Sequence, residues 1–299
     1  MRILIHTVSP EDEGRAVRSV VPRRFSLGEH AFRRLKVLEA IRVNGEIARA
    51  SRILHAGDEI EIRLPSQEAE TLIAESTQSS ALPASFIRYI DEDMIVVSKG
   101  APLPTLPASH IKTGTLREQL CRMLGADPAA FTYHPVNRLD KGTSGLLVIA
   151  RHAHAQRLLS AQLHTGGFIR EYLAVTEGVP SCAAGTIDAP IARLGAGARR
   201  AVMEGGQHAV THYRVEAASG AHALLRLRLE TGRTHQIRVH LAHTGCPIAG
   251  DYLYGTELPG LCGRFALHSA HLSCVQPITG QRITIDEPLP DALSALLYK

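Results

Sequence analysis

Aromatic side chains are scarce in this sequence of 299 residues: tryptophan is absent, and Phe, Trp and Tyr together make up 4%. Proteins that bind single-stranded nucleic acid without sequence preference stack the bases on rows of aromatic rings. The composition argues against such rows. If the protein binds nucleic acid, its affinity must come mainly from Arg and Lys.

Cysteines and long apolar runs are also rare. The five cysteines are odd in number and widely spaced, without a Cys-x-x-Cys pair, which argues against a disulfide framework and a zinc ribbon. No segment approaches the ~18 apolar residues of a membrane span, and the first residues lack an apolar run of signal-peptide length. We therefore expect a cytoplasmic protein with no membrane association. The cysteines are Cys121, Cys182, Cys246, Cys262 and Cys274.

The length of the chain favours two domains. With 44% hydrophobic residues the chain can bury a sizeable core, and 25 Gly with 16 Pro predict many turns. Residues 65–84 are polar, rich in Glu, Ser and Ala, and have Pro near both ends, as is typical of a linker. The sequence therefore predicts an N-terminal domain at 1–64 and a C-terminal domain at 85–299.

Strands and helices are mixed irregularly in the C-terminal domain. Residues 86–99 predict two strands around an acidic turn, 154–164 an amphipathic helix, and 209–215 with 223–229 a strand pair. Because strict βαβ alternation is absent, we expect an α+β fold with a mixed, largely antiparallel sheet. The glycine cluster at 195–198 lacks both the GxGxxG spacing and a following helix pattern, so it predicts no dinucleotide site.

Positive charge is concentrated near the N-terminus. Residues 15–64 contain eleven Arg or Lys and six Asp or Glu, whereas the whole chain has a net charge of +4. Such a surplus is typical of a phosphate-binding surface, although a generic arginine-rich surface has the same composition. The candidate phosphate contacts in this segment are Arg33, Arg34, Lys36 and Arg42.

The order of elements predicted for this segment resembles the S4 RNA-binding module. A helical pattern over 28–40 is followed by 41–47, which turns at Asn-Gly as hairpins do, and 56–62 closes with a turn and a strand. The first helix of that module matches poorly around 16–24, where we expect a shorter or irregular helix. The resemblance implies a small α/β module that binds RNA.

One short polar loop in the C-terminal domain, His134–Gly145, holds a carboxylate beside two basic residues. Asp140 lies between Arg138 and Lys141, and the apolar run 146–150 that follows predicts a buried strand. A carboxylate on a Gly-rich turn beside a buried strand suits nucleophilic or acid–base work. A solvated ion-pair cluster would have the same composition.

Four segments resemble, in the same order, the motifs of the RluA-type pseudouridine synthases. The loop resembles the His-Arg-Leu-Asp-x-x-Thr-Ser-Gly signature of that family, and Arg170–Val175 its tyrosine motif. Arg233–Ala242, continued by Gly245–Gly255, resembles the arginine motif, and Leu267–Gly280 the closing strand segment. The resemblance implies an isomerase that converts uridine to pseudouridine in RNA, without a cofactor or a metal.

The same resemblance implies roles for individual residues. Asp140 is the expected catalytic carboxylate, and Arg238 is the arginine expected to keep it ionised. Tyr172 is the ring expected to pack against uracil and to take part in proton transfer. The expected RNA contacts near the site are Arg138, Lys141 and Arg199, and the expected pocket residues are Thr143, Ser144, Gly145 and Leu267.

One residue departs from the family pattern: Asn137 stands where histidine is usual. Asparagine keeps hydrogen-bonding capacity but cannot carry a positive charge, which puts in doubt any role of that histidine. A second interpretation is therefore a catalytically inactive RNA-binding relative. A third is a metal-assisted hydrolase built on His235, His240 and His243 with Asp251, against which the lack of a His-Glu-x-x-His pattern argues.

The expected partner is RNA. Ribosomal RNA of the large subunit is favoured, because family members with an S4 module commonly act there, but transfer RNA stays open. The sequence identifies neither the uridine nor the chemical route that Asp140 follows. We expect a monomer.

Overall fold

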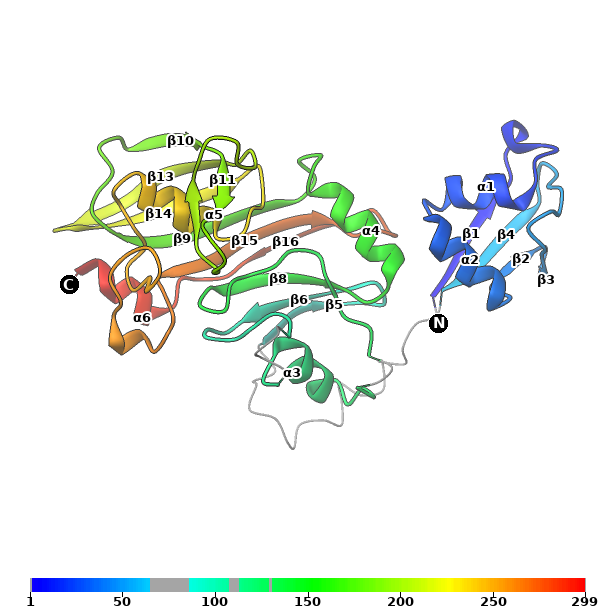
Figure 1. The fold of residues 1–299 in the computed structure, drawn as a ribbon. Coiled ribbons are helices and arrows are strands. Elements are labelled where there is room, and N and C mark those ends of the chain that lie inside the picture. The colour runs from blue at the N-terminus through cyan, green and yellow to red at the C-terminus, as the bar shows by residue number, and fades with distance from the viewer. Residues whose placement is uncertain (1, 65–85, 108–112, 129–130, 299) are drawn as a thin grey trace.

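The computed structural model describes residues 2–64, 86–107, 113–128 and 131–298. Two main sheets organise most of these residues: a small one near the N-terminus and a large one in the part of the chain after residue 85 (Figure 1). The linker predicted for 65–84 lies outside the described residues.

The N-terminal sheet has four antiparallel strands in the order β1-β4-β2-β3. Alternate strand residues, among them Ile41, Val43, Ile60 and Ile62, are buried in a core of their own with the two helices. The elements are β1 (Arg2–Thr7), α1 (Val17–Arg24), α2 (Glu29–Val37), β2 (Ile41–Val43), β3 (Glu46–Ile47) and β4 (Glu59–Leu64).

Two local expectations for this part of the chain can be compared with the structure. The predicted hairpin forms: Asn44 and Gly45 join β2 to β3 with φ of 53° and 80°, the positive angles that a two-residue hairpin turn needs. The short or irregular first helix expected around 16–24 agrees with α1, which has eight residues and contains Pro22. Val17, Val20 and Val21 are fully buried on it, so packing outweighs weak helix propensity.

The large sheet contains ten strands in the order β10-β13-β14-β9-β15-β8-β6-β5, with β16 beside β15 and β7 beside β8. All pairs are antiparallel except β15 with β8. This confirms the predicted mixed, largely antiparallel α+β fold. The strands are β5 (Ile87–Ile90), β6 (Met94–Lys99), β7 (His134–Pro135), β8 (Ser144–Ala150), β9 (Ile169–Glu177), β10 (Ala184–Asp188), β13 (Val210–Ser219), β14 (His222–Leu229), β15 (Leu267–Val275) and β16 (Arg282–Asp286).

Helices cover both faces of this sheet, so the central strand β8 is buried along its whole length. Leu147 and Ile149 belong to the core that contains residues of α3 and α5, whereas Leu146 and Val148 belong to the core under α4. This alternation follows the two-residue period of a strand. The helices are α3 (Leu116–Met123), α4 (Ala153–Gln162), α5 (Gln236–His243) and α6 (Asp291–Ser294), and a separate hairpin is formed by β11 (Ile191–Arg193) and β12 (Arg200–Val202).

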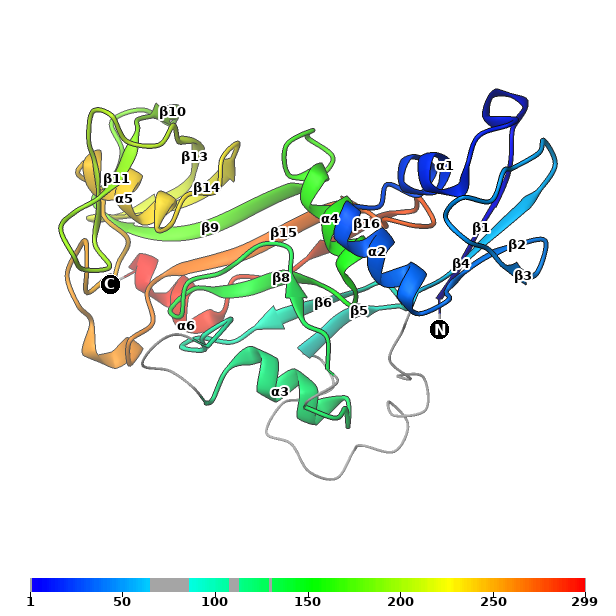
Figure 2. The ribbon, with the colours of Figure 1, turned by 45° about the vertical axis from the view of Figure 1, so that its right-hand side comes forward.

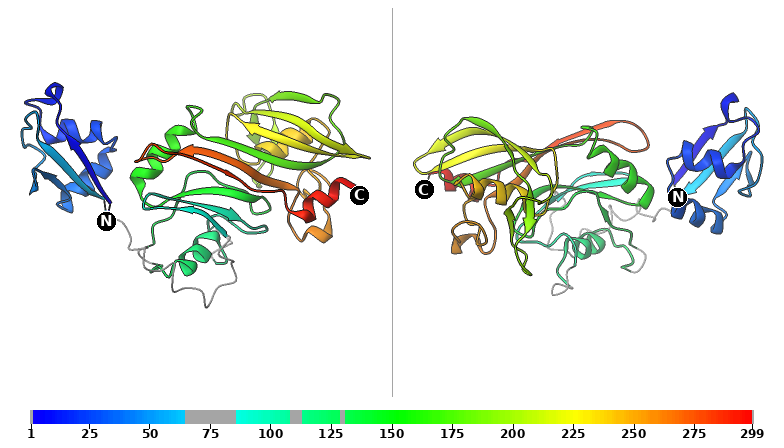
Figure 3. Two further views of the ribbon diagram at one scale, coloured as in Figure 1. Left: turned by 180° about the vertical axis from the view of Figure 1, so that it is seen from behind. Right: turned by 45° about the horizontal axis from the view of Figure 1, so that its top comes forward.

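The short parallel contact between β8 and β15 sets the place of the Asp140 loop. Gly145 pairs with Ser269 there, at a φ of 102°, and a Cβ on it would lie 2.2 Å from the Ser269 carbonyl oxygen. Only glycine fits such a close approach. Strand β15 in turn pairs with β9 along its length (Figures 2 and 3), so the loop before β8 lies near Tyr172 of β9.

In the described part of the chain, no helix is both long enough and apolar enough to span a membrane.

Candidate active site

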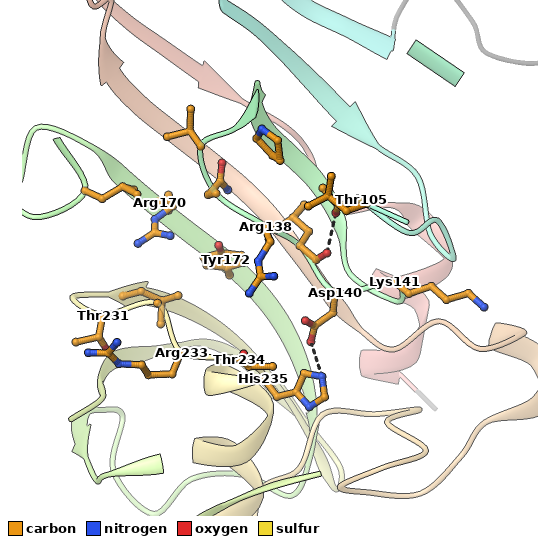
Figure 4. A pocket seen from close by; sticks show the side chains of 18 of the residues that line it. Thr105, Arg138, Asp140, Lys141, Arg170, Tyr172, Thr231, Arg233, Thr234 and His235 are labelled. Carbon is orange, nitrogen blue, oxygen red and sulfur yellow. Dashed lines mark hydrogen bonds and ion pairs between the residues drawn. The ribbon is translucent and has the colours of Figure 1, made fainter. Parts of the chain in front are cut away.

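A cavity of about 690 Å³ opens beside the Asp140 loop (Figure 4). The loop forms one wall, the start of β9 with Arg170 and Tyr172 another, and residues 229–235 before α5 a third. A narrower extension of about 60 Å³ reaches from Asp140 and Tyr172 to Arg238. The combined space lies within the ~300–1,000 Å³ that is usual for sites binding small molecules.

An ion-pair network lies at the inner end of this space. Arg238 Nη1 donates to Asp140 Oδ2 at 3.0 Å, while Arg238 Nε and Nη2 bind the two oxygens of Asp251 at 2.7 and 2.8 Å. The side chains of Arg238 and Asp251 are 3% and 0% exposed, whereas that of Asp140 is 28% exposed. The buried pair of Arg238 and Asp251 is thus a rigid support, and Asp140 is the member of the network that faces the cavity.

Aromatic rings surround the guanidinium of Arg238. Its Cζ lies 4.2 Å from the centroid of the Phe265 ring and 5.0 Å from that of Tyr254, distances at which a cation is attracted to a ring face. Burial lowers the pKa of Arg238, but the Asp251 and Asp140 carboxylates outweigh this effect and hold it above its ordinary value. Arg238 therefore stays charged and keeps its orientation.

Tyr172 lies on β9 with 4% of its surface exposed, and it lines the cavity together with Asp140. Burial raises the pKa of its phenol above the ordinary value. The hydroxyl therefore keeps its proton at neutral pH, and the ring presents an apolar surface beside the carboxylate.

The cavity is lined by more positive side chains than the sequence indicated. Arg138 and Lys141 flank Asp140 as expected, and both are exposed. Sequence reasoning missed Arg170 and Arg233, which also line the cavity; Figure 4 shows Arg138, Arg170 and Arg233 gathered around Tyr172, with the Lys141 side chain pointing away. Arg170 could have been found, because it lies two residues before Tyr172 and so shares its face of the strand.

The four expected pocket residues lie in two different places. Thr143 and Leu267 line the narrow extension with Asp140. Ser144 and Gly145 begin β8 and are buried behind the loop, outside the lining of both spaces. Ser144 Oγ is hydrogen-bonded to His268 Nδ1 at 2.8 Å and accepts from Arg264 Nη2 at 3.0 Å. The physical reason is that β8 begins at Ser144 and is buried along its whole length, whereas Thr143 still belongs to the loop beside the cavity.

Asn137, the departure from the family pattern, supports the loop from within. Its side chain is buried, and Oδ1 accepts a hydrogen bond from the Val148 backbone N–H at 3.1 Å. This bond ties the Asp140 loop to the middle of β8. A neutral acceptor is sufficient for it, so the substitution is compatible with an intact site.

The three histidines of the metal hypothesis are not assembled into a metal site. His240 is fully buried, with Nδ1 against Thr211 Oγ1 at 2.9 Å and Nε2 against the Ala189 carbonyl at 3.0 Å. His235 instead precedes α5 and faces Asp140, while Asp251 is engaged by Arg238. Among the described residues, no group of three or more His, Cys, Asp or Glu could hold a metal ion. The hydrolase interpretation therefore lacks a centre.

The remaining expected RNA contacts lie outside this cavity. Arg33, Arg34 and Lys36 are exposed on α2, where Arg33 pairs with Glu29 at 2.9 Å. Arg42 on β2 donates to the Gly45 carbonyl at 2.7 Å. Arg199 is exposed at the β11–β12 hairpin, with its guanidinium 5.9 Å from the Tyr254 ring.

Comparison with known proteins gives consistent matches. The family model described as RNA pseudouridylate synthase matches residues 93–243. An uncharacterized RNA pseudouridine synthase of Bacillus subtilis, YjbO, is 36% identical over 259 residues, which cover 86% of this chain and 89% of the relative. The ribosomal large subunit pseudouridine synthase D of Xanthomonas campestris is 37% identical over 276 residues, covering 85% and 79%.

Solved structures agree with these matches. The human RNA pseudouridylate synthase domain containing 1 superposes with a TM-score of 0.56 at 25% identity, covering 70% of this chain and 86% of that one. The human RNA pseudouridylate synthase domain containing 4 superposes with the same TM-score at 26% identity, covering 70% of this chain and 90% of that one.

Proposed function

The chain belongs to the RNA pseudouridylate synthase family and is an isomerase that acts on RNA, and from this premise we propose that Asp140 is its catalytic carboxylate and ribosomal RNA its substrate. The observation that carries the assignment of Asp140 is its contact with Arg238 at 3.0 Å on the wall of the cavity. Asp140 combines partial exposure with a fixed cationic partner.

Pseudouridine formation requires a group with the properties of this carboxylate. It breaks the N-glycosidic bond of a uridine, turns the uracil, and joins C5 of the base to the same sugar carbon; the proton lost from C5 is balanced by one gained at N1. An ionised carboxylate can attack the sugar or the base as a nucleophile, or stabilise a cationic sugar. Arg238 places a positive charge 3.0 Å from one oxygen of Asp140 and holds that oxygen in position. The isomerisation is redox-neutral and needs no activated donor.

Tyr172 supplies the surface on which the base can turn. Its ring is packed in β9 beside Asp140, and a flat apolar wall limits the motion of a detached uracil without binding it in one orientation. The phenol keeps its proton at neutral pH because burial raises its pKa. A role in removing the C5 proton would therefore require a proton acceptor to act with it.

RNA binding rests on the positive groups around the cavity entrance. Arg138, Arg170 and Arg233 line the cavity, whose acidic lining residues are Asp140 and Glu230. Extruding a nucleotide from its base stack costs a few kcal/mol of free energy. Contacts between these guanidinium groups and the phosphates on either side of the nucleotide can offset this cost. Aromatic stacking platforms are not needed for this mode of binding.

The assignment to ribosomal RNA is supported by the relatives whose names include the large ribosomal subunit. The test is to map pseudouridines in ribosomal and transfer RNA from cells with and without this gene, then to restore the gene. We expect one or more large-subunit sites to be lost and regained, while transfer RNA is unchanged. Loss confined to transfer RNA would contradict the substrate assignment and leave the enzyme class intact.

We propose further that residues 1–64 form a separate RNA-anchoring module. It has its own sheet and core, and Arg33, Arg34 and Lys36 are exposed together on α2. Among the described residues, Arg33 pairs with Glu29 at the surface and Lys36 Nζ lies 5.4 Å from the centroid of the Phe32 ring, and surface ion pairs contribute ~1 kcal/mol or less. These side chains are therefore free to bind phosphates.

A triple Arg33/Arg34/Lys36→Ala variant should bind RNA more weakly at low salt. Each lost phosphate contact should lower the slope of log affinity against log salt by about 0.7–0.9. The measurement is a salt titration of RNA binding, with the single-turnover rate at saturating RNA as the internal control. That rate should change little, because the proposed chemistry lies in the second domain. Normal binding with a lost maximal rate would contradict the anchoring role.

A further inference from the structure

His235 connects the Asp140 carboxylate to the β11–β12 hairpin through one hydroxyl group. The Tyr254 hydroxyl accepts a hydrogen bond from the Arg200 backbone N–H at 2.8 Å and lies 2.9 Å from His235 Nδ1. At the other side of the ring, His235 Nε2 lies 3.9 Å from Asp140 Oδ2; Figure 4 shows His235 directed at Asp140. His235 and Tyr254 thus lie between the hairpin and the carboxylate.

The two contacts of the Tyr254 hydroxyl favour one tautomer of His235. The Tyr254 hydroxyl already accepts from Arg200, and its own proton is available for His235 Nδ1. An imidazole that accepts at Nδ1 carries its proton at Nε2, the atom that faces Asp140. Burial lowers the pKa of His235 below its ordinary value, which favours this neutral form.

Both donors then act on the same oxygen of Asp140. Arg238 Nη1 is 3.0 Å from Oδ2, and His235 Nε2 approaches that oxygen too. Within the described residues, Oδ1 has no hydrogen-bond partner. Oδ2 is thus bound by Arg238 and approached by His235, which leaves Oδ1 as the oxygen available to react. The 3.9 Å separation is long for a hydrogen bond, as is common before substrate closes a site.

The backbone of His235 shows that its position is constrained. It precedes α5 in the left-handed region, with φ 58° and ψ 19°. Residues other than glycine seldom adopt this region, and such strain is concentrated at functional sites. Its side chain is 14% exposed and lines both parts of the cavity.

We propose that His235 is a positioning residue for Asp140: Tyr254 holds its ring, its Nε2–H restrains Oδ2 together with Arg238, and Oδ1 is thereby turned to the substrate. The inference rests on the proposed function, because it requires Asp140 to be the reacting group. It also links the β11–β12 hairpin, which carries Arg199 and Arg200, to Asp140 through Tyr254 and His235.

Two substitutions of similar size separate this role from a purely structural one. His235→Gln places an amide N–H close to the position of Nε2, whereas His235→Asn places it close to Nδ1, away from Asp140. Asparagine, however, tolerates the left-handed conformation better than glutamine. If His235 restrains Asp140, His235→Gln should retain activity and His235→Asn should lose it. If His235 serves only the left-handed backbone conformation, the order of the two activities should be reversed.

The measurement is the single-turnover rate at saturating RNA, with the RNA dissociation constant determined separately. We expect His235→Asn to lower the rate about 10- to 100-fold, the range for loss of a hydrogen bond to a charged group, and His235→Gln to stay within about threefold of wild type. The dissociation constant should be nearly unchanged in both. Equal rates for the two variants, or a faster Asn variant, would overturn the proposal.

Tyr254→Phe tests whether the hydroxyl acts through His235. In the wild-type background it should lower the single-turnover rate, and in the His235→Asn background it should cause no further loss, as expected for coupled residues. Additive losses would overturn the link. Asp140→Asn, measured in the same assay, separates failure of the proposed function from failure of this inference. If Asp140→Asn stays active, the proposed function fails. If it is inactive while His235→Gln and His235→Asn have equal rates, only this inference fails.

Discussion

Asp140→Asn should abolish isomerisation while leaving the protein folded and able to bind RNA. The change keeps the size of the side chain and removes its charge and its nucleophilic oxygen. We expect the single-turnover rate to fall at least about 10³-fold, given that loss of the nucleophile in a hydrolase costs about 10⁶-fold. A quenched assay of pseudouridine formation measures this directly.

The structure explains why this variant should remain folded. Arg238 keeps a bidentate partner in Asp251 when Asp140 is neutral, so no buried charge is left without compensation. The Asp140 side chain is 28% exposed, and its loss should change the free energy of unfolding by about 1 kcal/mol or less. Binding of RNA should be unchanged or slightly tighter, because a negative group is removed from a basic cavity.

A matched control is Asp188→Asn on β10, where the carboxylate is 64% exposed and pairs with His208. It removes the same charge away from the cavity and should behave as wild type. If Asp140→Asn forms pseudouridine at nearly the wild-type rate, Asp140 is not the catalytic carboxylate, and the whole assignment of the site has to be abandoned.

The sequence was informative where a short segment carries its own geometry. The Asn44-Gly45 turn can be read locally, since its positive φ angles are a property of those two residues. The motif around Asp140 and the spacing of Arg170 from Tyr172 are local as well. These features place the carboxylate in a loop and both β9 side chains on one face before any tertiary contact is known.

The sequence was less informative where function depends on which partners meet. Asp251 was considered only as a metal ligand, because nothing in its neighbours shows that a buried arginine 13 positions earlier will take both of its oxygens. Likewise, adjacency in a motif could not show that Thr143 faces the cavity while Ser144 is turned into the sheet. Such pairings are decided by packing between distant segments, which periodicity alone does not specify.

Arg238→Met should be the second most damaging change, and it should act on folding as well as on catalysis. It takes away the donor that binds Asp140 Oδ2, so the carboxylate loses its fixed cation. It also leaves the fully buried Asp251 without its partner. Removal of one member of a buried ion pair typically costs about 3–5 kcal/mol, which urea unfolding followed by circular dichroism would detect.

A second substitution separates the two effects. Asp251→Asn removes the orphaned charge but keeps an oxygen for the backbone N–H groups of Leu253 and Tyr254, which the carboxylate binds at 3.0 and 3.3 Å. The double variant Arg238→Met/Asp251→Asn should therefore regain much of the lost stability, since the two residues belong to one network and their effects are not additive. Its single-turnover rate should stay low, because Asp140 still has no arginine. Recovery of both stability and rate would show that Arg238 serves the fold alone, and that Asp140 needs no cation from it to react.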